Sequence, residues 1–418
     1  MPAAAVLDHV GPRADLIVPI GNGEPVTVLD ALEAHAAQLD HVRILQMHAL
    51  RDRPYLHGQH GDHLRHVSYF LSAVTRQPFW DGTISVVPNH FSEVPRLLLT
   101  ETRHSLVVAA ASPPDRHGYF SLGTGADYVA RLIGRVPFFV EANPRMPRTN
   151  GENLIHVSDV VGWCEAEYDL IEVPASDPSP VDRAIARLVA ERVADGSTIQ
   201  VGIGSIAEAI LGELTGHRDL GIHTELLSDG MAKLAELGVV TGSRKALRPH
   251  KMVTTFCLGT RWLYDWLDGN GSVELLPVDW VNNPATVARE HKFVSINATT
   301  EVDLLGQCAS ETVAGRYWSG SGGQADFARG AMAAEGGQAY VVVPSMTKHG
   351  ESRIRSQLTL GSVVTTSKNT VDHVVTEYGV AELRGRTVAE RARRLIAIAH
   401  PSVRDQLRAE AHAQGFIP

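Results

Sequence analysis

One glutamate stands where it could react with a substrate. The stretch GIHTELLSDG, residues 221–230, places Glu225 between a short apolar run and a Ser-Asp-Gly turn. A carboxylate at the end of a strand can be a solvated loop residue, or a nucleophile held at the mouth of a cleft. This stretch alone allows both interpretations, and the other candidate residues decide between them.

A glycine-rich loop could supply backbone N–H groups to an anion. In YWSGSGGQADFARGA, residues 317–331, Gly320, Gly322 and Gly323 follow an aromatic pair and precede a helix-like run. Such a loop favours a developing oxyanion or the pyrophosphate of a nucleotide-like ligand. The alternative is a surface loop without a ligand.

A second glycine-containing turn lies in STIQVGIGSIAEAIL, residues 197–211. Gly202, Gly204 and Ser205 join a strand-like run to an amphipathic helix, whose free N–H groups can bind an anion. The pattern is neither GxGxxG nor a P-loop, because no Gly-Lys-Ser/Thr follows. A tight turn between strand and helix explains it equally well.

Two further polar residues occupy turns. The strand-like stretch HVVTEY ends close to Glu377, and Gly379 allows a sharp turn after it. A carboxylate that stabilises the start of a helix is the alternative role for Glu377. Asn282 and Asn283 precede Pro284, which predicts a turn with side-chain amides available to a ligand.

Four histidines recur every three residues at His57, His60, His63 and His66. Histidine is a common zinc ligand, so the spacing raises the hypothesis of a metal site. Glycines interrupt any single helix through this stretch, and no cysteine lies nearby. We therefore expect loop or interface histidines and predict no metal.

Composition and charge exclude several classes of protein. The chain has 418 residues, 44% of them hydrophobic and 20% charged, which predicts two globular domains. A net charge of −9 argues against nucleic-acid binding. The three cysteines are far apart, and neither a signal peptide nor a membrane-spanning run is visible, so we expect a cytoplasmic enzyme.

Short apolar runs alternate with amphipathic stretches along the whole chain. This alternation predicts βα units around mostly parallel sheets, with ligands at the carboxyl ends of the strands. Residues 174–180, PASDPSP, disfavour helix and precede a strong amphipathic pattern. We therefore predict one α/β domain over residues 1–176 and a second over residues 181–418.

Together these stretches resemble the acetyl-CoA hydrolase/transferase family, which includes 4-hydroxybutyrate, butyryl-CoA:acetate and succinyl-CoA:acetate CoA-transferases. The resemblance covers nearly the whole chain. It rests on FSEVPRLL, ASPPDRHGYFSLG and NPRMPRTNGENLIHVSD in the first half, and on VGIGSIAEAI, IHTELLSDG, SGSGGQADFARGA, VTTSKNTVDHVVTEYGVAELRG and IAIAHPSVRDQL in the second. It implies two related α/β domains of the CoA-transferase type with the active site between them.

The resemblance also implies a mechanism. His223-Thr224-Glu225 matches the family motif that carries the nucleophilic glutamate. Glu225 would attack an acyl-CoA to give an acyl-glutamyl anhydride, and the released thiolate would convert it to a glutamyl-CoA thioester. A carboxylic acid would then reverse these steps, which is ping-pong kinetics. The CoA thioester is a substrate here, and no cofactor is implied.

The remaining site residues match family positions one by one. Gly322 and Gly323 match the loop whose backbone N–H is assigned to the oxyanion hole, and Glu377 matches a second glutamate that orients the site. The resemblance places five further residues in substrate or CoA binding: Gly202, Gly204, Ser205, Asn282 and Gly320.

Two other functions remain open at this stage. An acyl-CoA hydrolase would use the same glutamate, with water in place of the carboxylic acid. A silent CoA-binding protein would bind without turnover, although both glutamates are retained. The expected partners are acyl-CoA and a small carboxylic acid, with no nucleic acid or membrane, in a homodimer.

Overall fold

The computed structural model describes every residue from 1 to 418, and the chain forms two compact units. Unit 1 comprises Met1–Pro174, Leu227–Asp229 and Val253–Val281. Unit 2 comprises Ala175–Leu226, Gly230–Met252 and Asn282–Pro418. Each unit is thus assembled from segments that are not consecutive in the sequence. The division into residues 1–176 and 181–418 stays a prediction.

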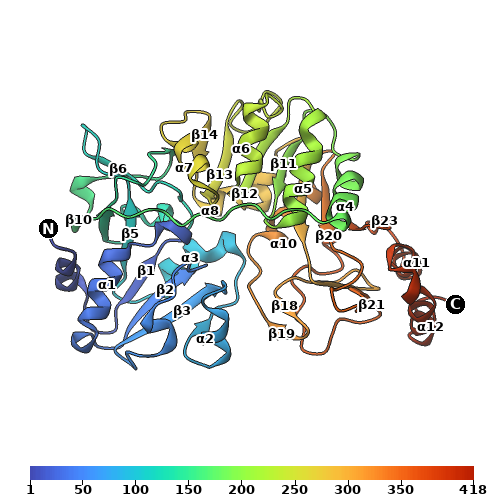
Figure 1. Cartoon of the computed structure of the whole chain (residues 1–418), viewed down its shortest axis with the longest axis horizontal. Helices are drawn as coiled ribbons and strands as arrows, with labels where there is room; N and C mark the ends of the chain where they lie inside the picture. Colours follow the sequence, from blue (N-terminus) through green and yellow to red (C-terminus); the bar gives the residue numbers. More distant parts are fainter. The chain divides into compact units, whose positions relative to one another are not determined.

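Unit 1 is built on a seven-stranded sheet with the order β10-β7-β5-β1-β2-β3-β4, in which every neighbouring pair is parallel. Figure 1 shows β1, β2 and β3 side by side. The strand β5 is LVVAAA, and all six residues are buried, as expected where helices cover both faces of a parallel sheet. The strands are β1 (Asp15–Val18), β2 (Val42–Met47), β3 (Leu64–Phe70), β4 (Ser85–Val86), β5 (Leu106–Ala111), β7 (Phe138–Ala142) and β10 (Gly162–Glu165).

The remaining elements of unit 1 surround this sheet or form short pairs. β6 (Tyr119–Ser121) pairs with β9 (Leu154–His156), and β8 (Asn150–Gly151) with β14 (Val273–Leu275); β13 covers Met252–Cys257. The helices are α1 (Val26–Ala34), α2 (Arg76–Trp80), α3 (Val94–Thr100), α7 (Arg261–Leu267) and α8 (Val278–Val281).

Unit 2 repeats the α/β plan with different strands. Its part of the second sheet has the order β23-β22-β20-β15-β11-β12, and every pairing is parallel except the one between β23 and β22. The strands are β11 (Thr198–Val201), β12 (Gly221–Leu227), β15 (Phe293–Ala298), β20 (Gln338–Val342), β22 (His373–Thr376) and β23 (Gly379–Glu382). The predicted α/β class with mostly parallel sheets is confirmed.

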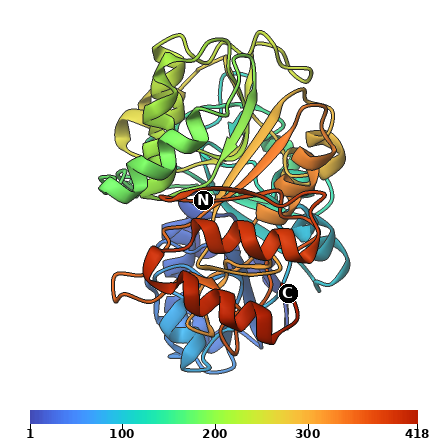
Figure 2. The same cartoon turned by 90° about the vertical axis from the view of Figure 1, so that its right-hand side faces the viewer.

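Helices and two small β structures complete unit 2. A three-stranded sheet joins β16 (Glu301–Asp303), β17 (Cys308–Ala309) and β21 (Ile354–Arg355), and β18 (Thr312–Val313) forms a hairpin with β19 (Arg316–Tyr317). The helices are α4 (Pro180–Ala190), α5 (Ser205–Glu213), α6 (Asp229–Glu236), α9 (Pro284–Val287), α10 (Gln324–Ala333), α11 (Val388–Ile398) and α12 (Arg404–Ala413). Figure 2 shows α11 and α12, in red, next to each other.

The Pro-rich stretch before α4 ends in a capping box. The Ser179 hydroxyl accepts from the Asp182 backbone N–H at 3.1 Å, and the Asp182 carboxylate accepts from the Ser179 N–H at 2.9 Å. Pro180 occupies the first helical position, where its missing N–H costs nothing. Local chemistry therefore sets the start of this helix. None of the helices has both the length and the apolar character needed to cross a bilayer.

Candidate active site

Strand β12 carries Glu225 near its carboxyl end. Its residues are buried with the single exception of Glu225, which is partly exposed. The strand runs two residues beyond Glu225, so the expectation that this glutamate ends the strand was wrong by two positions. His223 shares its face of the strand, because side chains alternate with a period of two. One carboxylate therefore reaches out from a strand that is otherwise packed.

Asn282 binds the carboxylate of Glu225. Its side-chain amide Nδ2 donates a hydrogen bond of 2.7 Å to Glu225 Oε2. Asn282 is fully buried and follows α8 directly, while the neighbouring Asn283 instead accepts from the Ala285 N–H and caps α9. Asn282 Oδ1 has no hydrogen-bond partner. The Asn-Asn-Pro turn thus directs one amide at the carboxylate and keeps a free buried acceptor beside it.

Gly323 lies against the same two side chains. A Cβ atom built on Gly323 would overlap Glu225 Oε2 and Asn282 Nδ2, so no other residue fits here without displacing that pair. The Gly323 backbone also hydrogen-bonds to Glu225. Gly323 is the N-cap of α10, whose first N–H groups are the positive end of the helix dipole. Gly322 precedes it with a φ of 54°.

The electrostatics of this group keep Glu225 poised between its two protonation states. Burial raises the pKa of Glu225, and the charge of Asp326 raises it further, while the hydrogen bonds from Asn282 and Gly323 lower it; the resulting pKa is about 7. Asp326 is buried in the first turn of α10. At neutral pH a substantial fraction of Glu225 is therefore an ionised, incompletely solvated carboxylate.

A buried ionic cluster supports β12 immediately before Glu225. Lys245 Nζ donates to the backbone carbonyl of Ile222 at 2.8 Å and lies 3.7 Å from Glu290 Oε1. Glu290 also accepts from the Ala246 N–H at 2.7 Å, and His223 Nδ1 lies 3.9 Å from it. Burial acts to raise the pKa of Glu290, but His223 and Lys245 hold it below its ordinary value.

His223 also connects this cluster to the glycine loop. Its ring packs edge-on against Phe293, at 6.0 Å between centroids, and against Phe327 of α10, at 6.5 Å. Lys245 and Glu290 have no motif around them, and they are 45 residues apart in the chain. Sequence reasoning missed both, because only the fold brings them together.

The turn after β11 lies on the strand next to Glu225. The β11–β12 register pairs Thr198 with Gly221 and Ile199 with Ile222, and Gly202 follows β11 directly. The Gly202 N–H donates to the Ile296 carbonyl, which fixes this end of β11. Gly204 has a φ of 107° and open space around it, and Ser205 begins α5. A Cβ atom on Gly202 would contact Asn297 Oδ1 and the Ile296 carbonyl oxygen, whereas nothing lies within 4 Å of one on Gly204.

Glu377 is held by a different partner. It follows β22, which ends at Thr376 rather than extending through Tyr378 as predicted. Its two carboxylate oxygens accept from the Ser345 N–H at 2.9 Å and the Ser345 hydroxyl at 2.5 Å. Ser345 is fully buried. The structure thus brings Asn282 and Gly323 onto Glu225, and it anchors Glu377 separately.

The histidine series does not converge on one point. His57 contacts Asp52 at 2.6 Å, His60 lies 3.6 Å from Glu33, and His63 contacts the Leu39 carbonyl at 2.6 Å. His66 is buried and stacks on Tyr55, with ring centroids 5.8 Å apart. These residues have separate partners, and no group of three His, Cys, Asp or Glu side chains is placed to hold a metal ion.

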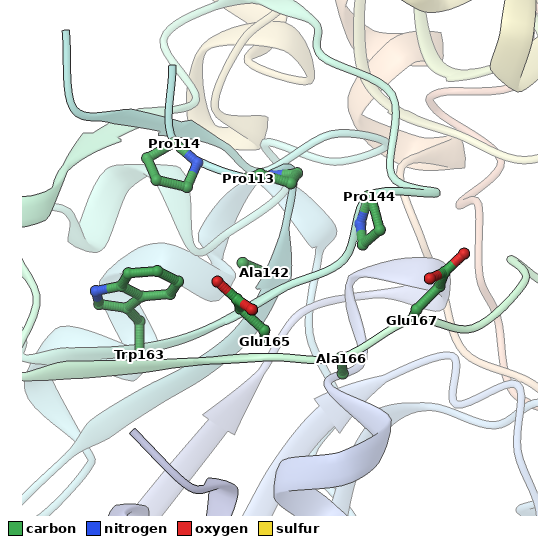
Figure 3. Close-up of a pocket in the computed structure, with 8 residues that line it drawn as sticks. All are labelled: Pro113, Pro114, Ala142, Pro144, Trp163, Glu165, Ala166 and Glu167. Carbon is green, nitrogen blue, oxygen red and sulfur yellow. The ribbon is translucent and has the colours of Figure 1, made fainter. Parts of the chain in front are cut away.

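A pocket of about 410 Å³ lies in unit 1, and none of the residues that line it is a predicted site residue. Figure 3 shows the indole of Trp163 and the carboxylates of Glu165 and Glu167 around it. Its other lining residues are Pro113, Pro114, Ala142, Pro144 and Ala166. Glu167 pairs with Arg145 at 3.0 Å. Sequence reasoning did not single out this pocket.

A carboxylate, an amide donor and a glycine at a helix start are groups that can perform acyl transfer. The family model for the acetyl-CoA hydrolase/transferase N-terminal domain matches residues 6–202, and the model for the C-terminal domain matches residues 259–411. The chain belongs to the acetyl-CoA hydrolase/transferase family, which confirms the resemblance drawn from its motifs.

Curated relatives match over almost their whole length. The succinyl-CoA:cyclohexane-1-carboxylate CoA transferase of Geobacter metallireducens is 42% identical over 96% of this chain and 92% of its own. The 4-hydroxybutyrate coenzyme A transferase of Clostridium kluyveri is 41% identical over 92% of this chain and 90% of its own. Both names describe transfer of CoA.

Solved structures with the same fold include RipA from Yersinia pestis, with a TM-score of 0.94, 34% identity and coverage of 100% of this chain and 98% of that one. A 4-hydroxybutyrate CoA-transferase from Porphyromonas gingivalis has a TM-score of 0.81 at 34% identity, covering 99% of this chain and 97% of that one.

The buried cluster under β12 yields a stability prediction. Lys245→Met removes a cation from a buried carboxylate and should lower the free energy of unfolding by about 3 kcal/mol. Urea denaturation measures it, with Lys368→Met, at an exposed lysine, as the control that should change stability by less than about 0.5 kcal/mol. Equal midpoints for the two variants would contradict the role assigned to Lys245.

Proposed function

We propose that Glu225 is the nucleophile through which this protein moves CoA from an acyl-CoA to a carboxylic acid. The observation that carries the proposal is the contact of Glu225 with two donors, the Asn282 amide at 2.7 Å and the Gly323 backbone, at the start of α10. These donors fix the orientation of the carboxylate. When one carboxylate oxygen forms a covalent bond, the donors can still hydrogen-bond to the glutamyl carbonyl oxygen.

The class of enzyme follows from the relatives. Proteins 41–42% identical over more than nine tenths of this chain are named CoA transferases, so the chain is an acyl-CoA:carboxylate CoA-transferase. Their acids differ from one another: one name contains cyclohexane-1-carboxylate and the other 4-hydroxybutyrate. The transferred group is common to them, and the acid is specific to each.

The first half-reaction begins at the thioester. A Glu225 oxygen adds to the thioester carbonyl carbon, the carbon–sulfur bond breaks, and CoA leaves as a thiolate with its electron pair. The product is an acyl-glutamyl anhydride. In this proposal Gly202, Gly204, Ser205 and Gly320 bind the acyl group or CoA, and Gly204 has open space around it.

The second step involves the donors already bound to Glu225. The thiolate adds to the Glu225 carbonyl carbon, and the former carboxylate oxygen Oε2 becomes an oxyanion. The Asn282 amide binds Oε2 in the resting enzyme, and the Gly323 backbone hydrogen-bonds to the same carboxylate. A donor of this kind contributes about 3 kcal/mol to lowering the barrier, because it is oriented before the charge develops.

Collapse of this intermediate completes the half-reaction. The acid leaves with the bridging oxygen, and Glu225 remains as a CoA thioester. A second carboxylate then adds to the glutamyl carbonyl and the same bonds form and break in reverse. The anchored carboxylate of Glu377 orients the site rather than attacking. No cofactor takes part in any step.

Hydrolysis is the alternative outcome of the same chemistry. Water in place of the second carboxylate would release CoA and regenerate Glu225. An acetyl-CoA hydrolase of Schizosaccharomyces pombe is 29% identical over 60% of this chain. The lengthy coverage by relatives named transferases favours transfer. A homodimer, a site between two domains and a cytoplasmic location stay predictions.

Borohydride provides the test of the covalent step. Incubation with an acyl-CoA should make the enzyme sensitive to borohydride, which reduces the glutamyl thioester and abolishes activity. Glu225→Ala should lower kcat by about 10⁴-fold or more, since nucleophile removal leaves only binding effects. Asp182→Ala, at a helix cap, is the matched carboxylate control. Full activity in Glu225→Ala would refute the mechanism, and thiol release that ignores added carboxylic acids would establish hydrolysis.

The raised pKa of Glu225 predicts an acid limb in kcat/KM. The nucleophile must be ionised, so kcat/KM should fall about tenfold per pH unit below a midpoint of about 7. Asp326→Asn removes a repulsive charge and moves the midpoint to lower pH, whereas Asn282→Ala removes a donor and moves it to higher pH. Shifts in the same direction for both variants would show that another group controls the limb.

A further inference from the structure

Glu311 is a buried carboxylate whose contacts converge on the glycine loop. It lies between β17 and β18 and is 5% exposed. Its Oε2 accepts from the Tyr317 hydroxyl at 2.6 Å, and its Oε1 accepts from the Ser321 hydroxyl at 3.1 Å and the Thr365 hydroxyl at 2.9 Å. Four oxygen-bearing side chains thus form one cluster, with the carboxylate at its centre.

The backbone of the same residue holds the start of the loop. The Glu311 carbonyl accepts from the N–H groups of Trp318 at 2.8 Å and Ser319 at 3.2 Å. The hairpin β18–β19 returns the chain to this point, with Thr312 paired to Tyr317. Both the backbone and the side chain of Glu311 therefore bind residues that lead directly into Gly322 and Gly323.

The far side of the cluster is also fixed. Thr365 Oγ1 donates to Glu311 and accepts from the Ser310 N–H at 2.9 Å. The hairpin turn at Gly315 lies against the backbone of Leu360, and a Cβ built on Gly315 would overlap the Leu360 carbonyl oxygen. The carboxylate is thus connected through Thr365 to the backbone of Ser310.

The sequence of residues 320–323 does not by itself favour one backbone conformation. Three of the four are glycines, which lose more conformational freedom on ordering than any other residue. Yet Gly323 must stay in contact with Glu225 to bind it. The Ser321 hydrogen bond to Glu311 is the side-chain anchor within this stretch, one residue before Gly322.

We propose that Glu311 is a positioning residue that holds the Gly323 N–H against Glu225. This inference rests on the proposed function, because it assigns Glu311 a role in the same oxyanion hole. Glu311 acts through Ser321 and the loop backbone and touches neither Glu225 nor substrate. Burial, and then the hydrogen bond to Glu311, raises the pKa of Tyr317, so this hydroxyl remains a donor.

Substitutions at Glu311 separate hydrogen bonding from charge. In Glu311→Gln the amide oxygen can still accept from Ser321 and Thr365, while the amide nitrogen can donate to the Tyr317 oxygen. Glu311→Ala removes the carboxylate that accepts hydrogen bonds from all three hydroxyls. Because the role is positional, the glutamine variant should retain most activity and the alanine variant should not.

The experiment compares Glu311→Ala, Glu311→Gln and Ser321→Ala with Asp182→Ala, a buried carboxylate that caps α4. Transfer kinetics give kcat and KM, and hydrogen exchange reports the backbone of residues 317–323. Glu311→Ala should lower kcat about 10²-fold with KM within about threefold, as for a misplaced catalytic group. Its loop amides should exchange at least about tenfold faster, while Glu311→Gln stays within about fivefold of wild-type kcat.

Two results would overturn the inference. In one, the loop amides of Glu311→Ala exchange faster but its kcat stays within about twofold of wild type, so that loosening the loop does not affect catalysis. The other is an equal loss of kcat in Asp182→Ala, which would point to general destabilisation. Failure of the proposed function is distinct, because it would leave Glu225→Ala active and wild type insensitive to borohydride. The hydrogen-exchange comparison of residues 317–323 in the Glu311 variants and wild type can be interpreted whether or not the proposed function is correct.

Discussion

Everything in the site follows from the need to hold one carboxylate away from bulk water. Glu225 is partly exposed on a strand whose other residues are buried, and its charge is stabilised by the Asn282 amide and the Gly323 backbone. A carboxylate with those donors can remain ionised, whereas burial alone would protonate it. The close approach requires a residue without a side chain at position 323, so Glu225 and the glycine loop constrain each other.

Two buried carboxylates that are not part of the site stabilise the segments that form it. Glu290, with Lys245 and His223, fixes the backbone of β12 before Glu225. Glu311, with Tyr317, Ser321 and Thr365, holds the loop that leads to Gly323. Neither contacts the proposed reacting atoms. Each has several partners, which offsets the cost of burying a charge and makes the geometry it supports rigid.

Local patterns predicted the parts of the fold that local physics determines. Alternating apolar runs and amphipathic stretches gave the α/β class, and the Pro-rich residues 174–180 with the amphipathic pattern after them predicted the helix that is α4. Family motifs identified Glu225, Asn282 and Gly323, which do lie together. They also suggested Glu377, but its bonds to Ser345 could not be foreseen, because the partners are 32 residues apart. The same limit hid Lys245, Glu290, Asp326 and Glu311, whose roles depend on contacts between distant segments.

The fate of one oxygen atom tests the central claim most directly. In the anhydride mechanism an oxygen of the incoming carboxylate bridges the acyl-glutamyl anhydride. When the thiolate attacks the acyl carbon, that oxygen remains on Glu225, so each turnover transfers one oxygen from the acid to the enzyme. Turnover with an oxygen-18 carboxylate, followed by peptide mass spectrometry, locates the label. The account predicts heavy oxygen confined to Glu225 in the peptide that contains it. Product formation with an unlabelled Glu225 would contradict it.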